Sequence, residues 1–100
     1  RVRDRIFGDA EIFADPAWDI LLDLVDDERA KRSVSVTSAC IAACVPPTTA
    51  LRWISVLETE NYVERITDVL DGRRRFLRLT SKAHKLMNQF YIELNRRRLI

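Results

Sequence analysis

Glycine, histidine and cysteine are all scarce in this sequence of 100 residues, which contains two, one and two of them. The glycines, Gly8 and Gly72, do not form the glycine-rich loop that cradles a phosphate. His84 has no nucleophile motif near it, so the sequence offers no catalytic triad of the Ser-His-Asp type. These absences indicate that the protein is not an enzyme.

The two cysteines, Cys40 and Cys44, lie in one apolar stretch. A small secreted domain held by disulfides normally has more of them, which favours a reducing cytoplasm. A structural zinc site needs about four ligands, and only these thiols and His84 are on offer. We expect no metal, no cofactor, and both cysteines packed toward the core as small apolar groups. A redox switch is the alternative for the pair.

Long apolar runs are also missing, since none approaches the roughly 18 residues of a membrane-spanning helix. Hydrophobic residues make up 47% and charged residues 32%, which is typical of a globular domain, and we expect residues 1–100 to form one. The charge is uneven, because residues 1–50 carry a net charge of −3 and residues 51–100 one of +5. A basic half favours a surface that faces a polyanion.

Helix caps, chain breakers and apolar periodicity predict the order of elements. Asp15-Pro16, Thr37 and Thr80 are signals for helix starts, and Asp71-Gly72 is a signal for a tight hairpin turn. Helices are expected at about 1–14, 15–28, 37–44, 47–60 and from 81 onward, and strands at about 34–36, 62–66 and 73–79. Two short helices joined by a short turn and followed by a hairpin predict a winged helix-turn-helix. The expected fold class is mainly α (α+β), with about five helices and a small β-hairpin wing.

The helix that begins at Pro47 is the second of the pair, which in this motif enters the major groove of DNA. Ala50, Ile54 and Leu57 share one face and should pack inward. The opposite face offers hydroxyls and an arginine, which can reach phosphates or fork onto guanine, with no carboxylate before Glu58. An ordinary amphipathic helix with solvated polar residues is the alternative. The candidate DNA contacts of the helix pair are Thr37, Ser38, Pro47, Thr48, Thr49, Arg52 and Ser55.

The run Arg73, Arg74 and Arg75 lies near the expected hairpin tip. From there it can reach an adjacent minor groove, whose potential attracts arginine. The alternative is a solvated edge strand, because charges on edge strands also prevent aggregation. Three adjacent arginines repel one another without a partner, so we favour contact with DNA.

The helix expected at 15–28 is apolar around most of its circumference, which predicts more than one covering neighbour. The terminal segments 1–14 and 81–100 carry further apolar residues, and exposed patches of this kind usually mark interfaces. We expect these segments to form a homodimer that sets two recognition helices about one DNA turn apart, or a multiple of it. The candidate dimerisation residues are Ile6, Phe7, Phe13, Phe90 and Leu94.

Over about residues 16–94 the chain resembles the MarR-type (multiple antibiotic resistance regulator) winged-helix regulators. The family pattern of the recognition helix fits Thr48-Thr49, Arg52 and Leu57. The family wing pattern, Asp-Arg-Arg followed by a hydrophobic strand that ends in Leu-Thr, fits Asp71-Gly72-Arg73 and Leu77-Arg78-Leu79-Thr80. The resemblance implies a homodimer, a palindromic operator and no required cofactor.

The chain departs from the family pattern at Asn61, Gly72 and Ala83, and its terminal helices are shorter. The sequence as a whole predicts specific binding of double-stranded DNA by a cytoplasmic transcription regulator, without a membrane partner. The alternative is a winged-helix protein-protein interaction module without specific DNA binding. Retention on heparin or on a random duplex at low salt would separate the two.

Overall fold

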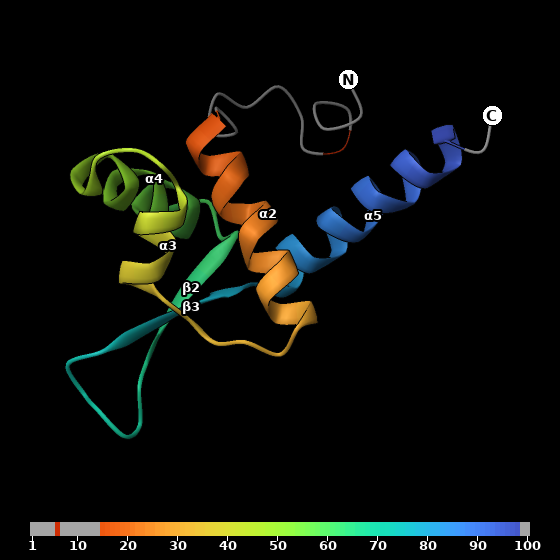
Figure 1. The fold of residues 1–100 in the computed structure, drawn as a ribbon. Helices are drawn as coiled ribbons and strands as arrows, with labels where there is room; N and C mark the ends of the chain where they lie inside the picture. Colours follow the sequence, from red (N-terminus) through yellow and green to blue (C-terminus); the bar gives the residue numbers. More distant parts are fainter. Residues whose placement is uncertain (1–5, 7–14, 99–100) are drawn as a thin grey trace.

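The computed structural model describes Ile6 and residues 15–98 (Figure 1). Its elements are α2 (Asp15–Arg29), β1 (Val34–Ser35), α3 (Val36–Ala42), α4 (Pro47–Thr59), β2 (Val63–Thr67), β3 (Arg75–Leu79) and α5 (Ser81–Arg98). This order confirms the winged helix-turn-helix class. Residues 15–98 form four α-helices, α2 to α5. The helix expected at 1–14, including Phe7 and Phe13, lies outside them apart from Ile6.

The three strands form one antiparallel sheet in the order β1-β3-β2. Strands β2 and β3 pair from Val63 opposite Leu79 to Thr67 opposite Arg75. Strand β1 adds only two residues at the other edge, with Val34 opposite Leu77. Because side chains alternate along a strand, β3 turns Leu77 and Leu79 into the core, where both are buried.

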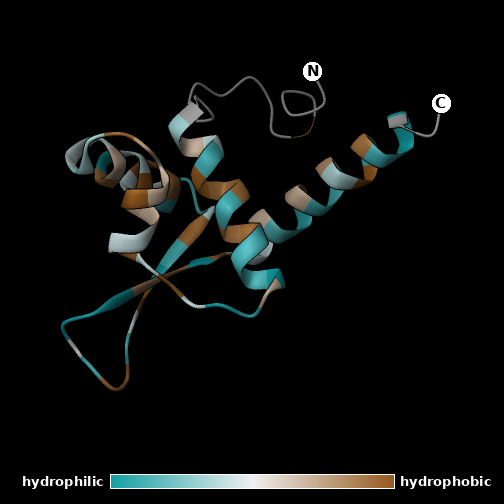
Figure 2. Ribbon diagram, in the orientation of Figure 1, coloured by the Kyte–Doolittle hydropathy of each residue, from teal (hydrophilic) through white to brown (hydrophobic). Residues whose placement is uncertain are grey.

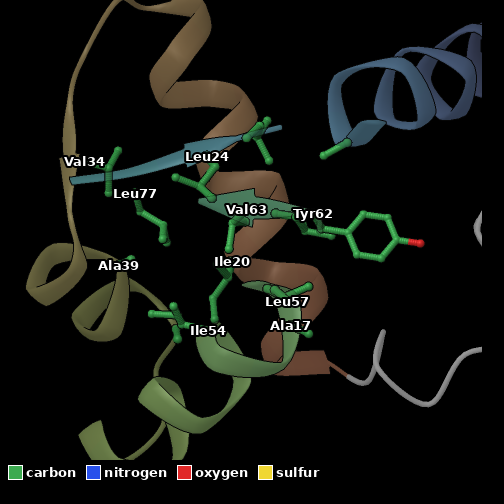
Figure 3. Close-up of a cluster of buried hydrophobic side chains, with 14 of the residues drawn as sticks. Ala17, Ile20, Leu24, Val34, Ala39, Ile54, Leu57, Tyr62, Val63 and Leu77 are labelled. Atoms are coloured by element: carbon green, nitrogen blue, oxygen red, sulfur yellow. The ribbon is translucent and has the colours of Figure 1, made fainter. Parts of the chain in front are cut away.

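The core lies between α2, α4 and the sheet (Figure 3). Ile20, Leu24, Ile54, Leu57 and Val63 point toward one another there, and each is at most 2% exposed. Full burial of one such side chain stabilises the fold by about 1.5–3 kcal/mol. Helix α2 is therefore covered on more than one side, as its apolar circumference predicts.

Helix α3 begins earlier than the sequence predicts. The N-cap is Ser35, whose backbone is extended and whose Oγ accepts a 3.1 Å hydrogen bond from the Ser38 N–H. The prediction of Thr37 as the N-cap is wrong, because the strand before the helix ends one residue sooner and Val36 is already helical. Thr37 consequently lies in the first turn of α3.

The prediction that both cysteines face the core is half wrong. Cys40 is buried within α3, and this burial raises the pKa of its thiol, with Arg65 opposing the shift. Cys44 is exposed, because α3 ends at Ala42 and Cys44 adopts a left-handed backbone with φ of 57°. Helical spacing therefore no longer relates the two thiols.

Helix α5 starts at the end of the sheet and extends away from the rest of the described chain (Figure 1). Thr80 caps it as expected, since its Oγ1 accepts a 3.2 Å hydrogen bond from the Ala83 N–H and donates one of 2.7 Å to the Asn61 carbonyl. Glu28 at the end of α2 accepts a 3.1 Å hydrogen bond from the Leu79 N–H. These contacts join α2, the sheet and α5 at one point.

Within residues 15–98, no single helix is long and apolar enough to span a membrane. Helices α3 and α4 pass that test only as a pair bent by 114°. In this fold α4 buries Ala50, Ile54 and Leu57 against the core.

Candidate nucleic-acid interface

Helix α4 is oriented by its buried face. Ala50, Ile54 and Leu57 are 0% exposed, which confirms the inward face predicted from their spacing. Pro47 occupies the first turn, where its missing N–H costs nothing. No acidic residue lies in that turn and no side chain caps it, so the helix dipole there favours an anion.

The outer face of α4 is a stripe of exposed polar side chains at a spacing of three to four residues. Thr48, Arg52 and Ser55 lie on it as expected, and Thr59 continues it. Arg52, Ser55 and Thr59 line one shallow open cleft together. Thr49 is half-buried beside the stripe. Sequence reasoning missed Thr59, although its position four residues after Ser55 was the available signal.

Arg65 of β2 connects the stripe to the sheet. Its Nη2 donates a 3.2 Å hydrogen bond to Ser55 Oγ, and its Nε lies 3.3 Å from a carboxylate oxygen of Glu58. These two contacts link the outer face of α4 to β2. The Ser55 oxygen is thus used inside the protein, while its own proton remains available as a donor.

The loop between β2 and β3, residues 68–74, is the tip of the wing. A turn does begin at Asp71-Gly72, but it does not join the two strands directly as predicted, because the Asp68 N–H bonds the Arg74 carbonyl at 3.0 Å and closes a wider loop. Within it the Arg74 N–H bonds the Asp71 carbonyl at 2.9 Å. A side chain at Gly72 would meet nothing within 4 Å, so this loop does not demand glycine there.

The three wing arginines have different surroundings. Arg75 braces the loop, because its Nη1 donates to the carbonyls of Gly72 at 2.7 Å and Arg74 at 3.3 Å. The Arg73 side chain is 94% exposed and lies 3.5 Å from an Asp71 carboxylate oxygen. The Arg74 guanidinium stacks 5.0 Å above the ring of Phe76. Arg73 and Arg74 are consequently the charges best placed for an outside partner.

An open cleft of about 440 Å³ separates the start of α3 from the wing. We call it the basic cleft; it is lined by Ser35, Val36, Thr37, Arg65, Asp71, Arg73, Arg74 and Arg75. It brings the Thr37 hydroxyl to the same opening as the three wing arginines, although they are far apart in the sequence. A hydroxyl and several guanidinium groups around one opening suit a phosphate group.

Ser38 is not part of the basic cleft. Its Oγ accepts a 2.9 Å hydrogen bond from Ser35 Oγ, and it lines a pocket of about 50 Å³ with Asp23 and Asp27 of α2. Burial, followed by the neighbouring charges of Asp27, Asp19 and Asp26, raises the pKa of the Asp23 carboxyl. The acidic side of α2 therefore faces this part of α3, and it would repel a phosphate backbone.

The candidate dimerisation residues that the structure describes lie partly against their own chain. Phe90 packs edge to face on Trp18, with ring centroids 4.9 Å apart, and Ile6 packs against the core. Leu94 is half-buried on the far part of α5, where Ile92 is 53% exposed. The homodimer stays a prediction.

No group of three or more His, Cys, Asp or Glu side chains that could hold a metal ion occurs in the part of the chain that the structure describes. His84 is a surface residue with its side chain 56% exposed. Its Nε2 lies 3.0 Å from a carboxylate oxygen of Glu28. This pair links α5 to the end of α2.

No family model matches the sequence, and no curated protein matches it. Solved structures do match. S. aureus MepR bound to ethidium bromide has a TM-score of 0.78 and 18% identity, over 97% of this chain and 67% of that one. A MepR mutant bound to an oligodeoxyribonucleotide has a TM-score of 0.74 and 19% identity, over 86% and 61%.

NadR in complex with 4-hydroxyphenylacetate has a TM-score of 0.71 and 25% identity, over 84% of this chain and 57% of that one. The present chain thus spans between 57% and 67% of the length of these three proteins. The similarity covers at least 84% of this chain in each case, and it establishes the winged-helix architecture independently of the sequence patterns.

Proposed function

We propose that this chain, which has the fold of the MarR-type winged-helix regulators, binds double-stranded DNA sequence-specifically as a transcription regulator. The observation that carries the proposal is the basic cleft, where the start of α3 meets the wing arginines. The start of α3 and the wing, which line this cleft, lie on the side of the molecule that also carries α4, away from the direction of α5 (Figure 1). A MepR mutant with this fold has been solved bound to an oligodeoxyribonucleotide.

In this proposal α4 enters the major groove, whose width of about 12 Å admits one helix. Arg52 lies in the middle of the exposed stripe, where its guanidinium can fork onto the O6 and N7 of a guanine. Thr48 and Thr49 flank the first turn and can reach phosphates or base edges. The uncapped start of α4 at Pro47 favours a phosphate at the groove edge.

The wing contacts the minor groove or the adjacent backbone. Arg73 and Arg74 supply the charge, because Arg75 already braces the loop. Thr37 is placed to donate to a phosphate that occupies the basic cleft. The sequence is read by α4, and the wing contributes affinity that depends on salt.

The same proposal includes a homodimer that reads a palindromic operator in the cytoplasm, without a cofactor or catalytic activity. Residues 1–14 and 81–100 are the proposed dimerisation segments. The exposed Ile92 on the projecting part of α5 supports an interface there. Sedimentation that shows only monomer at micromolar concentration would contradict this part of the proposal.

Selection of bound duplexes from a random pool tests the function directly. The wild-type protein should enrich one motif with twofold symmetry, and Arg52→Ala should lose preference at one position of each half-site. Arg32→Ala is the matched control, because Arg32 is exposed, lies outside the basic cleft and pairs with Asp27 at 2.8 Å. No enrichment by the wild-type protein would contradict the proposal.

The alternative function is a winged-helix module that binds another protein. The observation in its favour is the exposure of two adjacent apolar residues at the wing tip, Val69 and Leu70. Such a module would pass through a random-duplex column at low salt. A DNA-binding protein would be retained and would elute as salt rises.

A further inference from the structure

The tip of the wing exposes two large apolar side chains next to each other. Val69 is 100% and Leu70 is 96% exposed, the highest values among the exposed large hydrophobic residues of the described chain. Figure 2 shows this tip as a hydrophobic segment at the far end of the loop, followed by a hydrophilic one. Apolar surface exposed at a projecting point is unfavourable in water, and contact with a partner would remove it from water.

Hydrogen bonds hold the backbone of the loop around these two side chains. The Leu70 N–H donates to Asp68 Oδ1 at 2.9 Å, and the Arg73 N–H donates to Asp71 Oδ1 at 3.0 Å. The brace from Arg75 to the Gly72 carbonyl holds the other side of the loop. The carboxylates of Asp68 and Asp71 are therefore turned toward the loop backbone. Val69 and Leu70, between them, are almost fully exposed.

The charges beside the tip decide which partner fits. Arg73 and Arg74 follow the apolar pair within the same loop, and Arg73 is almost fully exposed. The minor groove attracts arginine by its negative potential. Proteins that bind this groove often insert apolar side chains between base steps there. A second protein would need a larger apolar surface than two side chains that lie between Asp68 and Asp71 and are followed by three arginines.

We propose that Val69 and Leu70 form an apolar wedge. The wedge enters the minor groove beside Arg73 and partly opens one base step. This inference rests on the proposed DNA-binding function and extends it to the shape of the bound duplex. The duplex should bend at the wing contact. The operator should carry an easily unstacked pyrimidine–purine step, TA or CA/TG, at that point.

The test measures the bend and the affinity of the selected duplex with the full chain, by fluorescence energy transfer between dyes at the duplex ends. Leu70→Ser and Val69→Ser should lower the affinity by about tenfold each and reduce the bend. Leu70→Met and Val69→Ile are the matched controls, because they keep an apolar tip and should retain both. Replacing the TA or CA/TG step by a stiff A-tract should weaken the wild-type protein more than the serine variants.

Serine variants that bend and bind the duplex as the wild-type protein does would overturn the wedge while leaving the proposed function intact. A wild-type protein that binds no duplex would overturn both. Loss of affinity by Arg52→Ala with the bend preserved would support the division of labour between α4 and the wing. Serine variants that lose binding to a protein partner but not to DNA would also overturn the wedge.

Discussion

Helix α4 and the wing present their functional side chains on the same side of the protein, but they are held in opposite ways. The inward face of α4, from Ala50 to Leu57, is closed off from water. The wing loop is held by exposed hydrogen bonds, two accepted by the carboxylates of Asp68 and Asp71 and one donated by Arg75. Each such bond contributes only about 0.5–1.5 kcal/mol. The position of α4 is therefore fixed by the core, whereas the wing can yield to its partner.

The largest predicted effect contrasts one leucine from each region. Leu57→Ala should lower the free energy of unfolding by about 2–5 kcal/mol, because Leu57 is 0% exposed and its removal leaves a cavity. Leu70→Ala should change it by less than about 0.5 kcal/mol, because Leu70 is 96% exposed. Urea unfolding followed by circular dichroism measures both. Equal losses for the two variants would show that the wing tip is packed and would break the comparison.

The next largest loss of stability is expected at the junction between the wing and α5. Thr80→Ala should lower the free energy of unfolding by about 1–2 kcal/mol, because it removes the cap of α5 and the hydrogen bond to Asn61. Thr80→Ser is the matched control, since it keeps the hydroxyl and should stay close to the wild-type protein. If the alanine variant is as stable as the serine variant, the wing and α5 are joined by apolar contacts alone.

The smallest predicted effect concerns the acidic side of α2, the helix against which α3 and α4 pack. Burial and like charges raise the folded-state pKa of Asp23 above its usual 3.8. Asp23 therefore costs no stability below pH 3.8, where its carboxyl is protonated in both the folded and the unfolded protein. Stability is lost as the pH rises through the folded-state pKa, because the buried carboxyl must then ionise.

Asp23→Asn removes this loss, so at pH 7 the variant should be more stable than the wild-type protein by about 0.2–0.5 kcal/mol. Below pH 3.8 the difference should vanish. Urea unfolding at both pH values measures it, and the affinity for DNA should not change. A less stable variant at pH 7 would mean that the carboxylate has a favourable partner.

Local signals predicted the elements whose ends are determined by neighbouring residues. Pro47 starts α4, and Thr80 caps α5. The end of α3 could not be predicted in this way. No breaker stands at Ala42, and the left-handed backbone at Cys44 is one that a cysteine does not signal in a sequence.

The candidate site was predictable in its parts but not in its assembly. The stripe on α4 and the arginines of the wing follow from spacing and composition. The basic cleft, in contrast, depends on the register of β1 against β3, which brings Thr37 near the wing. The same register turns Ser38 toward Asp23 and Asp27, away from the arginines. The sequence alone does not show that Thr37 lies near the wing arginines or that Ser38 lies near the aspartates of α2.

The most direct test of the account compares Arg52→Ala with Arg74→Ala on the selected operator and on a scrambled duplex at several salt concentrations. Arg52→Ala should cost about 1–3 kcal/mol of operator binding and little on the scrambled duplex. Arg74→Ala should weaken both duplexes alike and make the salt dependence shallower by about one unit. Arg78→Ala is the control, because Arg78 lies 2.7 Å from Glu64 and outside the basic cleft. If Arg52→Ala weakens both duplexes equally while Arg74→Ala loses only the operator, the assignment of base reading to α4 is wrong.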